Sequence, residues 1–114
     1  MSKRKTSLYI PRQCEILGHT LYTVINDELC DEQNAVGCSV FPRNVIYLRH
    51  PSSLYCLELI ESTYFHEKKH YEFYFSGENE LNANEKLVDL LGNMEYQFLK
   101  TSGFRLPPKD RIRF

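Results

Sequence analysis

A short segment near the middle of the chain constrains the fold more than any other feature. Residues 66–70 are His-Glu-Lys-Lys-His, and they lie inside residues 54–74, where apolar side chains recur with the period of an α-helix. Residues four apart lie on one face of a helix, so His66 and His70 can reach a single metal ion. Glu67 projects close to that face, where a carboxylate can take a proton from metal-bound water. The segment therefore predicts a helix with two candidate metal ligands and a candidate catalytic base.

Segments rich in β-branched and aromatic residues precede this helix, and a second helical segment follows it. Gly18, between the first two of these segments, is expected to form a bulge or a kink. This order predicts an α+β fold, in which a small twisted sheet of three to four strands, antiparallel or mixed, packs on the first helix. The expected strands are residues 14–17, 19–25, 37–41 and 45–48.

Turn-forming residues set the expected limits of the two helices. Residues 51–53, Pro-Ser-Ser, predict the start of the first helix, and Ser76 with Gly77 predicts its end. Residues 78–84 are expected to form a polar connection, and an asparagine within 82–84 is expected to cap the second helix, which runs through Lys100. The second helix carries apolar residues at helical spacing, namely Leu87, Leu90, Leu91, Met94 and Phe98.

Length and composition limit the number of domains and the classes of partner. The 114 residues predict a single domain, with residues 1–12 as a flexible basic arm and residues 104–114 as a C-terminal extension. The net charge of −1 and the lack of a basic, aromatic face argue against a nucleic-acid partner. No apolar run reaches about 18 residues and no signal peptide is recognisable, so we expect no membrane partner and a cytoplasmic location. The four cysteines form no C-x-x-C pair and are expected to be reduced thiols.

A catalytic zinc site needs a third ligand from a separate element. Glu85, at the start of the second helix, points back toward His70 if the two helices are antiparallel. Glu80 in the connection and Asp89 one turn further along are the alternatives, and Asp89 can instead accept a hydrogen bond from an imidazole N–H. Two imidazoles and a carboxylate suit Zn²⁺ well. The sequence thus favours Glu85 and leaves the other two open.

A solvated helix surface is the competing interpretation of residues 66–70, but the aromatic residues on both sides favour a partly buried segment. His19 and His50 are interpreted as strand-end or loop histidines outside the site. Hydrolysis of a carbonyl also needs a donor for the oxyanion that forms. The residues available for that role are Tyr64, Tyr71, Tyr74 and His50, and the sequence does not choose among them.

Three segments of the chain carry a family resemblance: residues 45–48 (Val-Ile-Tyr-Leu), 63–70 (Thr-Tyr-Phe-His-Glu-Lys-Lys-His) and 84–91 (Asn-Glu-Lys-Leu-Val-Asp-Leu-Leu). Together they resemble the minimal gluzincin-like metallopeptidases, many of which are small proteins encoded by phages and prophages. The resemblance covers roughly residues 14–100. It implies Zn²⁺ bound by His66, His70 and Glu85, with Glu67 as general base. It also implies that an edge strand, residues 37–41, aligns an extended peptide by strand addition.

Two functions are compatible with these patterns. The favoured one is a zinc-dependent, peptidase-like domain that hydrolyses a peptide bond in a protein or peptide with metal-activated water. For a phage-encoded protein, the site of action is the host-cell cytoplasm. The alternative is a catalytically weak or inactive zincin scaffold, such as a phage accessory protein that regulates a host or phage protein by binding it. Lys68 and Lys69 stand where such helices usually carry apolar or small residues, and their stems can run along apolar surface.

Overall fold

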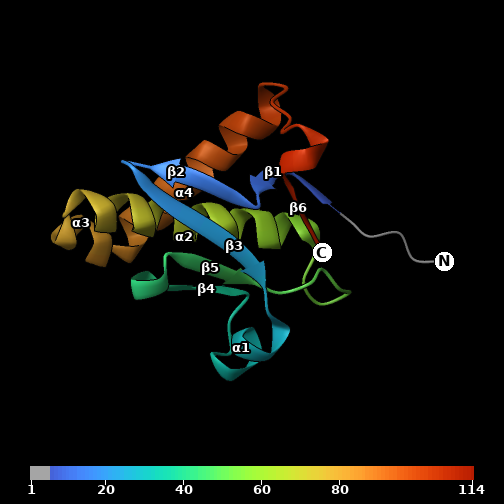
Figure 1. Ribbon diagram of the computed structural model, residues 1–114, viewed down its shortest axis with the longest axis horizontal. Helices are drawn as coiled ribbons and strands as arrows, with labels where there is room; N and C mark the ends of the chain where they lie inside the picture. The colour runs from blue at the N-terminus through green and yellow to red at the C-terminus, as the bar shows by residue number, and fades with distance from the viewer. Residues whose placement is uncertain (1–5) are drawn as a thin grey trace.

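Residues 6–114 are described by the computed structural model, and they form a four-stranded mixed sheet, a two-stranded sheet and two long helices that pack together (Figure 1). The predicted α+β class and the packing of a sheet on the first long helix are confirmed. The elements are, in chain order, β1 (Thr6–Pro11), β2 (Gln13–Ile16), β3 (His19–Ile25), α1 (Asp27–Glu32), β4 (Gly37–Val40), the 3₁₀ turn η1 (Phe41–Arg43), β5 (Val45–Leu48), α2 (Leu57–Ser76), α3 (Asn79–Ala83), α4 (Glu85–Thr101), the 3₁₀ turn η2 (Pro108–Asp110) and β6 (Arg111–Arg113).

The larger sheet has the strand order β2-β3-β5-β4. The β3–β5 pair is parallel, and the two outer pairs are antiparallel. Leu17 and Gly18, with φ of 51° and 80°, form a two-residue turn between β2 and β3. Positive φ at both residues is typical of a type I′ hairpin turn, so the expected bulge or kink at Gly18 is wrong. β4 lies at the edge of the sheet, and no other described strand pairs with its free side.

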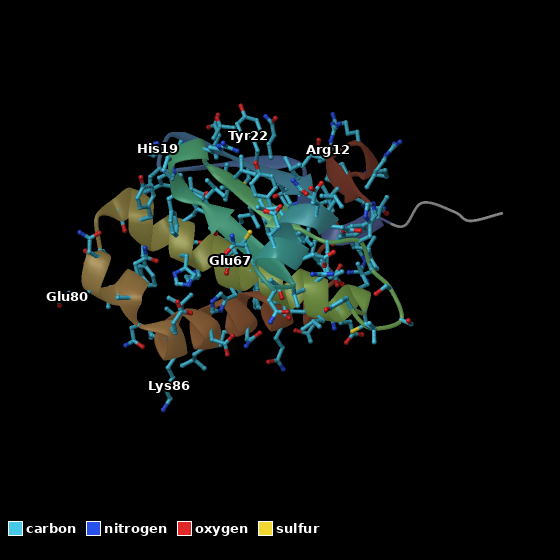
Figure 2. All side chains as sticks on the ribbon, turned by 90° about the horizontal axis from the view of Figure 1, so that it is seen from below. Arg12, His19, Tyr22, Glu67, Glu80 and Lys86 are labelled. Carbon is cyan, nitrogen blue, oxygen red and sulfur yellow. The ribbon has the colours of Figure 1, made fainter. Side chains whose placement is uncertain are left out.

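The long helices form two layers behind the sheet. Leu21, Ile46 and Leu48 are fully buried on the inner face of the sheet and belong to one core with Ile60 and Tyr64 of α2. α4 packs on the opposite side of α2. Figure 2 shows the strands, α2 and α4 in this order from top to bottom. α2 is thus covered on both sides, and its middle lies between β4 and α4.

The two ends of the described chain form the second sheet, in which β1 pairs with β6. Ile10 of β1 is fully buried and Ile112 of β6 is 6% exposed. The predicted flexible arm is therefore wrong for Thr6–Pro11, while residues 1–5 lie outside the described residues. The pairing partner stands at the far end of the sequence, within the predicted C-terminal extension, so a local pattern could not reveal it.

The helix limits differ from the predicted ones at a single end. α2 begins at Leu57, because the Ser52 hydroxyl accepts the N–H groups of Leu54 and Tyr55 and closes a separate turn. The predicted end at Gly77 (φ 76°) and the predicted cap at Asn84 are confirmed.

The connection between the long helices contains the short helix α3. All four cysteines are free thiols, as predicted. Within residues 6–114, no helix is both long enough and apolar enough to cross a membrane.

Candidate metal centre

The metal-ligating atoms of His66, His70 and Glu85 converge at one place. The two Nε2 atoms each lie 3.1 Å from a carboxylate oxygen of Glu85, and the three ligand atoms are all within 4.8 Å of one another. Neither alternative belongs to this group: Glu80 is exposed on α3, and Asp89 contacts the other side of one ring. The described residues thus contain a possible His-His-Glu metal site, with the third group predicted from the sequence.

A close contact between α2 and α4 brings Glu85 to the histidines. A Cβ atom on Gly92 would lie 2.9 Å from the carbonyl oxygen of Phe65 and 3.0 Å from the backbone nitrogen of His66. Only glycine fits this approach without a shift of backbone. Glu85 and Asp89 precede Gly92 by seven and three residues, so all three share one face of α4. Gly92 therefore positions both acidic residues over His66.

Hydrogen bonds to the Nδ1 atoms orient the two imidazole rings. His66 Nδ1 lies 3.3 Å from the carboxylate of Asp89, and His70 Nδ1 lies 2.6 Å from the side-chain oxygen of Asn82. Both oxygens can only accept, so a hydrogen on each Nδ1 satisfies them and leaves each Nε2 able to bind a cation placed between the rings and Glu85. Imidazoles held in this tautomer are suited to bind a cation through Nε2. Sequence analysis missed the role of Asn82, whose only signal is its position in the connection between the ligand-bearing helices.

Glu67 lies beside the ligand group and is held by the edge strand. The Ser39 hydroxyl of β4 donates to Glu67 Oε1 at 2.8 Å, and Oε2 is 3.7 Å from His66 Nε2. Burial raises the pKa of Glu67 above its ordinary value, although the hydrogen bond from Ser39 and the two nearby histidines act in the opposite direction. Figure 2 labels Glu67 between the strands above and α4 below. Ser39 carries no sequence motif, so its contact became visible only in the fold.

The surface is hollowed on both sides of His66, next to β4. One hollow of about 430 Å³ is lined by Phe41 and Asn82 among others, together with the ligand group and Glu67. The other, of about 330 Å³, is lined by Gly37, Asn93 and neighbouring residues of α2 and α4. Both border β4, the edge strand of the sheet. The two hollows therefore lie between the edge strand and the possible metal-ligand group.

The two lysines of the motif point away from the ligand group. Lys68 Nζ lies 2.8 Å from Glu95 of α4 and 2.9 Å from Glu72, and Lys69 Nζ lies 2.7 Å from Glu72. Burial acts to lower the pKa of Lys68, but the hydrogen bonds that it donates to Glu95 and Glu72 outweigh burial and raise the pKa. Each ammonium group is thus compensated by a carboxylate on a different side of α2 from the histidines.

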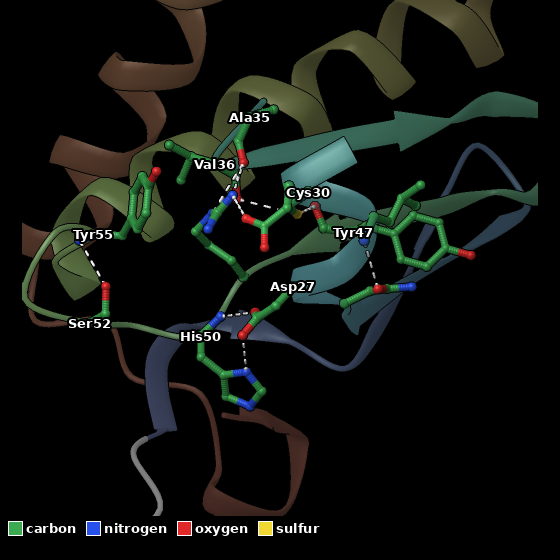
Figure 3. A network of polar contacts seen from close by, with 12 residues as sticks. Asp27, Cys30, Ala35, Val36, Tyr47, His50, Ser52 and Tyr55 are labelled. Atoms are coloured by element: carbon green, nitrogen blue, oxygen red, sulfur yellow. Dashed lines mark hydrogen bonds and ion pairs between the residues drawn. The ribbon is translucent and has the colours of Figure 1, made fainter. Parts of the chain in front are cut away.

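The start of β4 is anchored by a polar network around Arg49 (Figure 3). Arg49 donates to the carbonyl oxygen of Ala35 through Nη2 at 2.8 Å and through Nε at 3.1 Å. His50 follows in the chain, and its ring lies 3.1 Å from the carboxylate of Asp27. The network fixes the strand that holds Ser39.

The two other histidines lie outside the site. His19 stacks on Phe75, with ring centroids 4.2 Å apart. Neither His19 nor His50 joins the ligand group, as predicted.

Three of the four candidate oxyanion donors are engaged elsewhere. The Tyr71 hydroxyl bonds the backbone of Val40 and Val45, and burial raises its pKa to about 12. Tyr64 is buried near Cys14 on another side of α2, and His50 binds Asp27. Tyr74 is 42% exposed and packs on Phe41, which lines the larger hollow. Tyr74 therefore remains available.

Comparison with known proteins adds no further assignment. The chain matches no protein-family model, no curated protein and no solved structure. The site is consequently defined by its own geometry: three groups that can hold a metal ion, a partly buried carboxylate beside them, and an edge strand alongside.

Proposed function

We propose that the protein is a zinc-dependent, peptidase-like domain of the minimal gluzincin type, which hydrolyses a peptide bond. The observation that supports this most is the convergence of His66, His70 and Glu85 with Glu67 beside them. Two imidazoles and a carboxylate suit Zn²⁺, and three protein ligands leave a position open for chemistry. When bound, zinc supplies Lewis acidity that lowers the pKa of a water molecule to about 7.

Glu67 takes the role of general base. Ser39 holds Oε1, so Oε2 is the oxygen that faces the histidines and can accept a proton. The same carboxyl group then delivers the proton to the leaving amine. Ser39 is a positioning residue in this scheme, because it orients Glu67 without reaching the reacting atoms.

The substrate is an extended peptide or a flexible segment of a protein. The free side of β4 offers backbone groups for strand addition, which aligns the peptide past the metal centre. The hollows on either side of His66 receive side chains next to the cleaved bond. Tyr74 is the candidate donor to the oxyanion. The proposed place of action is the cytoplasm, which is that of the host cell if the protein is phage-encoded.

The Glu67→Gln variant tests this proposal. Wild type and variant are loaded with zinc and incubated with a mixture of random-sequence peptides, and new peptide ends are identified by mass spectrometry. We expect equal zinc content in both proteins and cleavage by the wild type alone. The matched control is Glu80→Gln, the same change at an exposed residue of α3, which should cleave like the wild type. Cleavage retained by Glu67→Gln would rule out the proposed base.

A binding module built on the same scaffold is the second candidate. The observation that favours it is the engagement of Tyr64, Tyr71 and His50 elsewhere, which leaves few donors for an oxyanion. In this case a partner protein is retained equally by wild type and Glu67→Gln, and also after chelation. Fully zinc-loaded wild type that cleaves no peptide in the mixture would favour this function over hydrolysis.

A further inference from the structure

Helix α4 carries its apolar side chains on the face turned away from the protein. The side packed on α2 consists of Val88, Gly92 and Tyr96 together with polar residues. The predicted apolar positions of this helix are therefore not its main packing face. We call them the α4 apolar face, formed by Leu87, Leu90, Leu91, Met94 and Phe98.

The side chains at the centre of the α4 apolar face are more than half exposed. Leu90, Met94 and Phe98 are 55%, 57% and 67% exposed. With roughly 150–250 Å² for a large side chain, these three expose on the order of 300 Å² together. Leu87 and Leu91 are partly exposed and extend the patch. A contiguous apolar patch of a few hundred Å² commonly marks an interaction site.

The acidic residues at the start of α4 lie away from this face. Glu85 and Asp89 are on the side of α2, where they contact the histidines. The exposed neighbours Gln97 and Thr101 are uncharged. Figure 2 shows α4 along the lower edge of the molecule, where the labelled Lys86 projects away from the rest of the chain. Lys86, one turn before Leu90, is therefore the charge that a partner surface meets at the border of the α4 apolar face.

We propose that the α4 apolar face binds a second copy of this chain, in a two-fold antiparallel helix pair. A two-fold contact uses the same patch twice, so the three most exposed side chains alone contribute about 600 Å². Leu87, Leu91 and the polar neighbours have to supply the remainder of the about 1,000 Å² that marks the lower end of specific interfaces. In an antiparallel pair the two Lys86 side chains lie toward opposite ends of the interface, so they do not face each other across the two-fold axis. The ligand group lies on the other side of α4, so the pair leaves the metal centre accessible.

Sedimentation equilibrium of the full chain tests the proposal, since an interface of this size predicts a weak dimer. Over concentrations from about 1 to about 500 µM, the mass should rise from that of one chain toward twice that value. Leu90→Glu and Met94→Glu place a charge in the face and should raise the dimer dissociation constant more than about 10-fold. Both positions are exposed, so circular dichroism should show an unchanged fold.

The matched control is Leu54→Glu, which makes the same change at an 81% exposed residue before α2. It should dimerise like the wild type. The proposal is overturned if the wild type stays monomeric at every concentration, if both α4 variants dimerise normally, or if Leu54→Glu is equally impaired. A monomer that sediments with phosphatidylcholine vesicles, and loses this with Leu90→Glu, would assign the face to a lipid surface and also overturn it.

Discussion

Residues 66–70 of α2 present two sides of the helix that differ in how their charged groups are paired. On one side, Lys68 and Lys69 each lie within 3 Å of a carboxylate, and the charges cancel locally. On the other side, the rings of His66 and His70 turn Nε2 toward Glu85, and each Nδ1 has a hydrogen-bond acceptor. The same stretch of helix therefore holds a closed ion-pair network and an open ligand group.

This difference explains how a motif with two lysines can still attract a cation. Glu67, Glu85 and Asp89 surround the two imidazoles, and the lysine charges are already matched elsewhere. The site side thus has an excess of negative charge, which favours a cation. Breaking either side separately should have different consequences for metal binding and for stability.

The largest expected effect is that of Glu85→Ala on the open side. Removal of a direct ligand should raise the zinc dissociation constant more than about 100-fold, since loss of an outer-shell partner alone costs 10- to 100-fold. Competition with a chelating dye measures the constant, and Glu80→Ala on α3 is the control. A change smaller than about threefold would remove Glu85 from the ligand set.

Asp89→Ala should weaken zinc binding by about 10- to 100-fold, because the Nδ1 hydrogen of His66 loses its acceptor and the ring loses its orientation. The same competition assay measures it. Asn93→Ala, one turn further along α4, should bind zinc like the wild type. Equal affinities of the two variants would mean that Asp89 is only a surface charge.

Gly92→Ala tests the contact that joins the two helices. The added Cβ meets backbone of Phe65 and His66 at 2.9–3.0 Å, so the variant should lose about 1–3 kcal/mol of unfolding free energy despite the better helix propensity of alanine. Urea unfolding measures this loss, and zinc affinity should fall with it. If propensity alone mattered, the variant would be more stable than the wild type.

The smallest effect on zinc affinity is expected from a change on the side of α2 that carries Lys68 and Lys69. Lys68→Met should leave zinc affinity unchanged and lower the unfolding free energy at pH 7 by about 1 kcal/mol. The pKa of Lys68 is raised in the folded state, so its contribution is complete below about pH 10 and is lost as the pH rises through the raised pKa.

At low pH, protonation of Glu72 removes the stabilisation that this ion pair gives to the folded state. Burial acts to raise the pKa of Glu72, but hydrogen bonds from Lys69 and Lys68 outweigh it, so the pKa is lowered. The contribution of Glu72 to the unfolding free energy is complete above about pH 4.5 and is lost as the pH falls through its lowered pKa. Unfolding curves of Lys68→Met and wild type should therefore differ most between about pH 5 and 10. A difference that does not change with pH would show that only packing was lost.

The spacing of residues along the sequence predicted the ligand group of His66, His70 and Glu85. Two histidines four apart on a helix must share a face, and Glu85 beside a capping asparagine starts the next helix, so their convergence was predicted and is confirmed. Zinc binding and catalysis remain predictions. Ser39 and Asn82 were missed because their contacts depend on how distant elements pack.

Two further features of the fold could not be predicted for the same reason. The strand β1 pairs with residues about 100 positions away, and no local pattern encodes that partner. The apolar period of α4 was recognised, but periodicity does not tell which face is buried. In this fold Gly92 and Tyr96 face α2, while Phe98 faces outward.

Calorimetric titration of metal-free protein with Zn²⁺ tests the central claim most directly. Our account predicts one zinc ion per chain for the wild type, and no binding to that site in the His66→Ala/His70→Ala double variant, with the fold of both verified by circular dichroism. Failure of the wild type to bind zinc, or equal binding by the double variant, would contradict it.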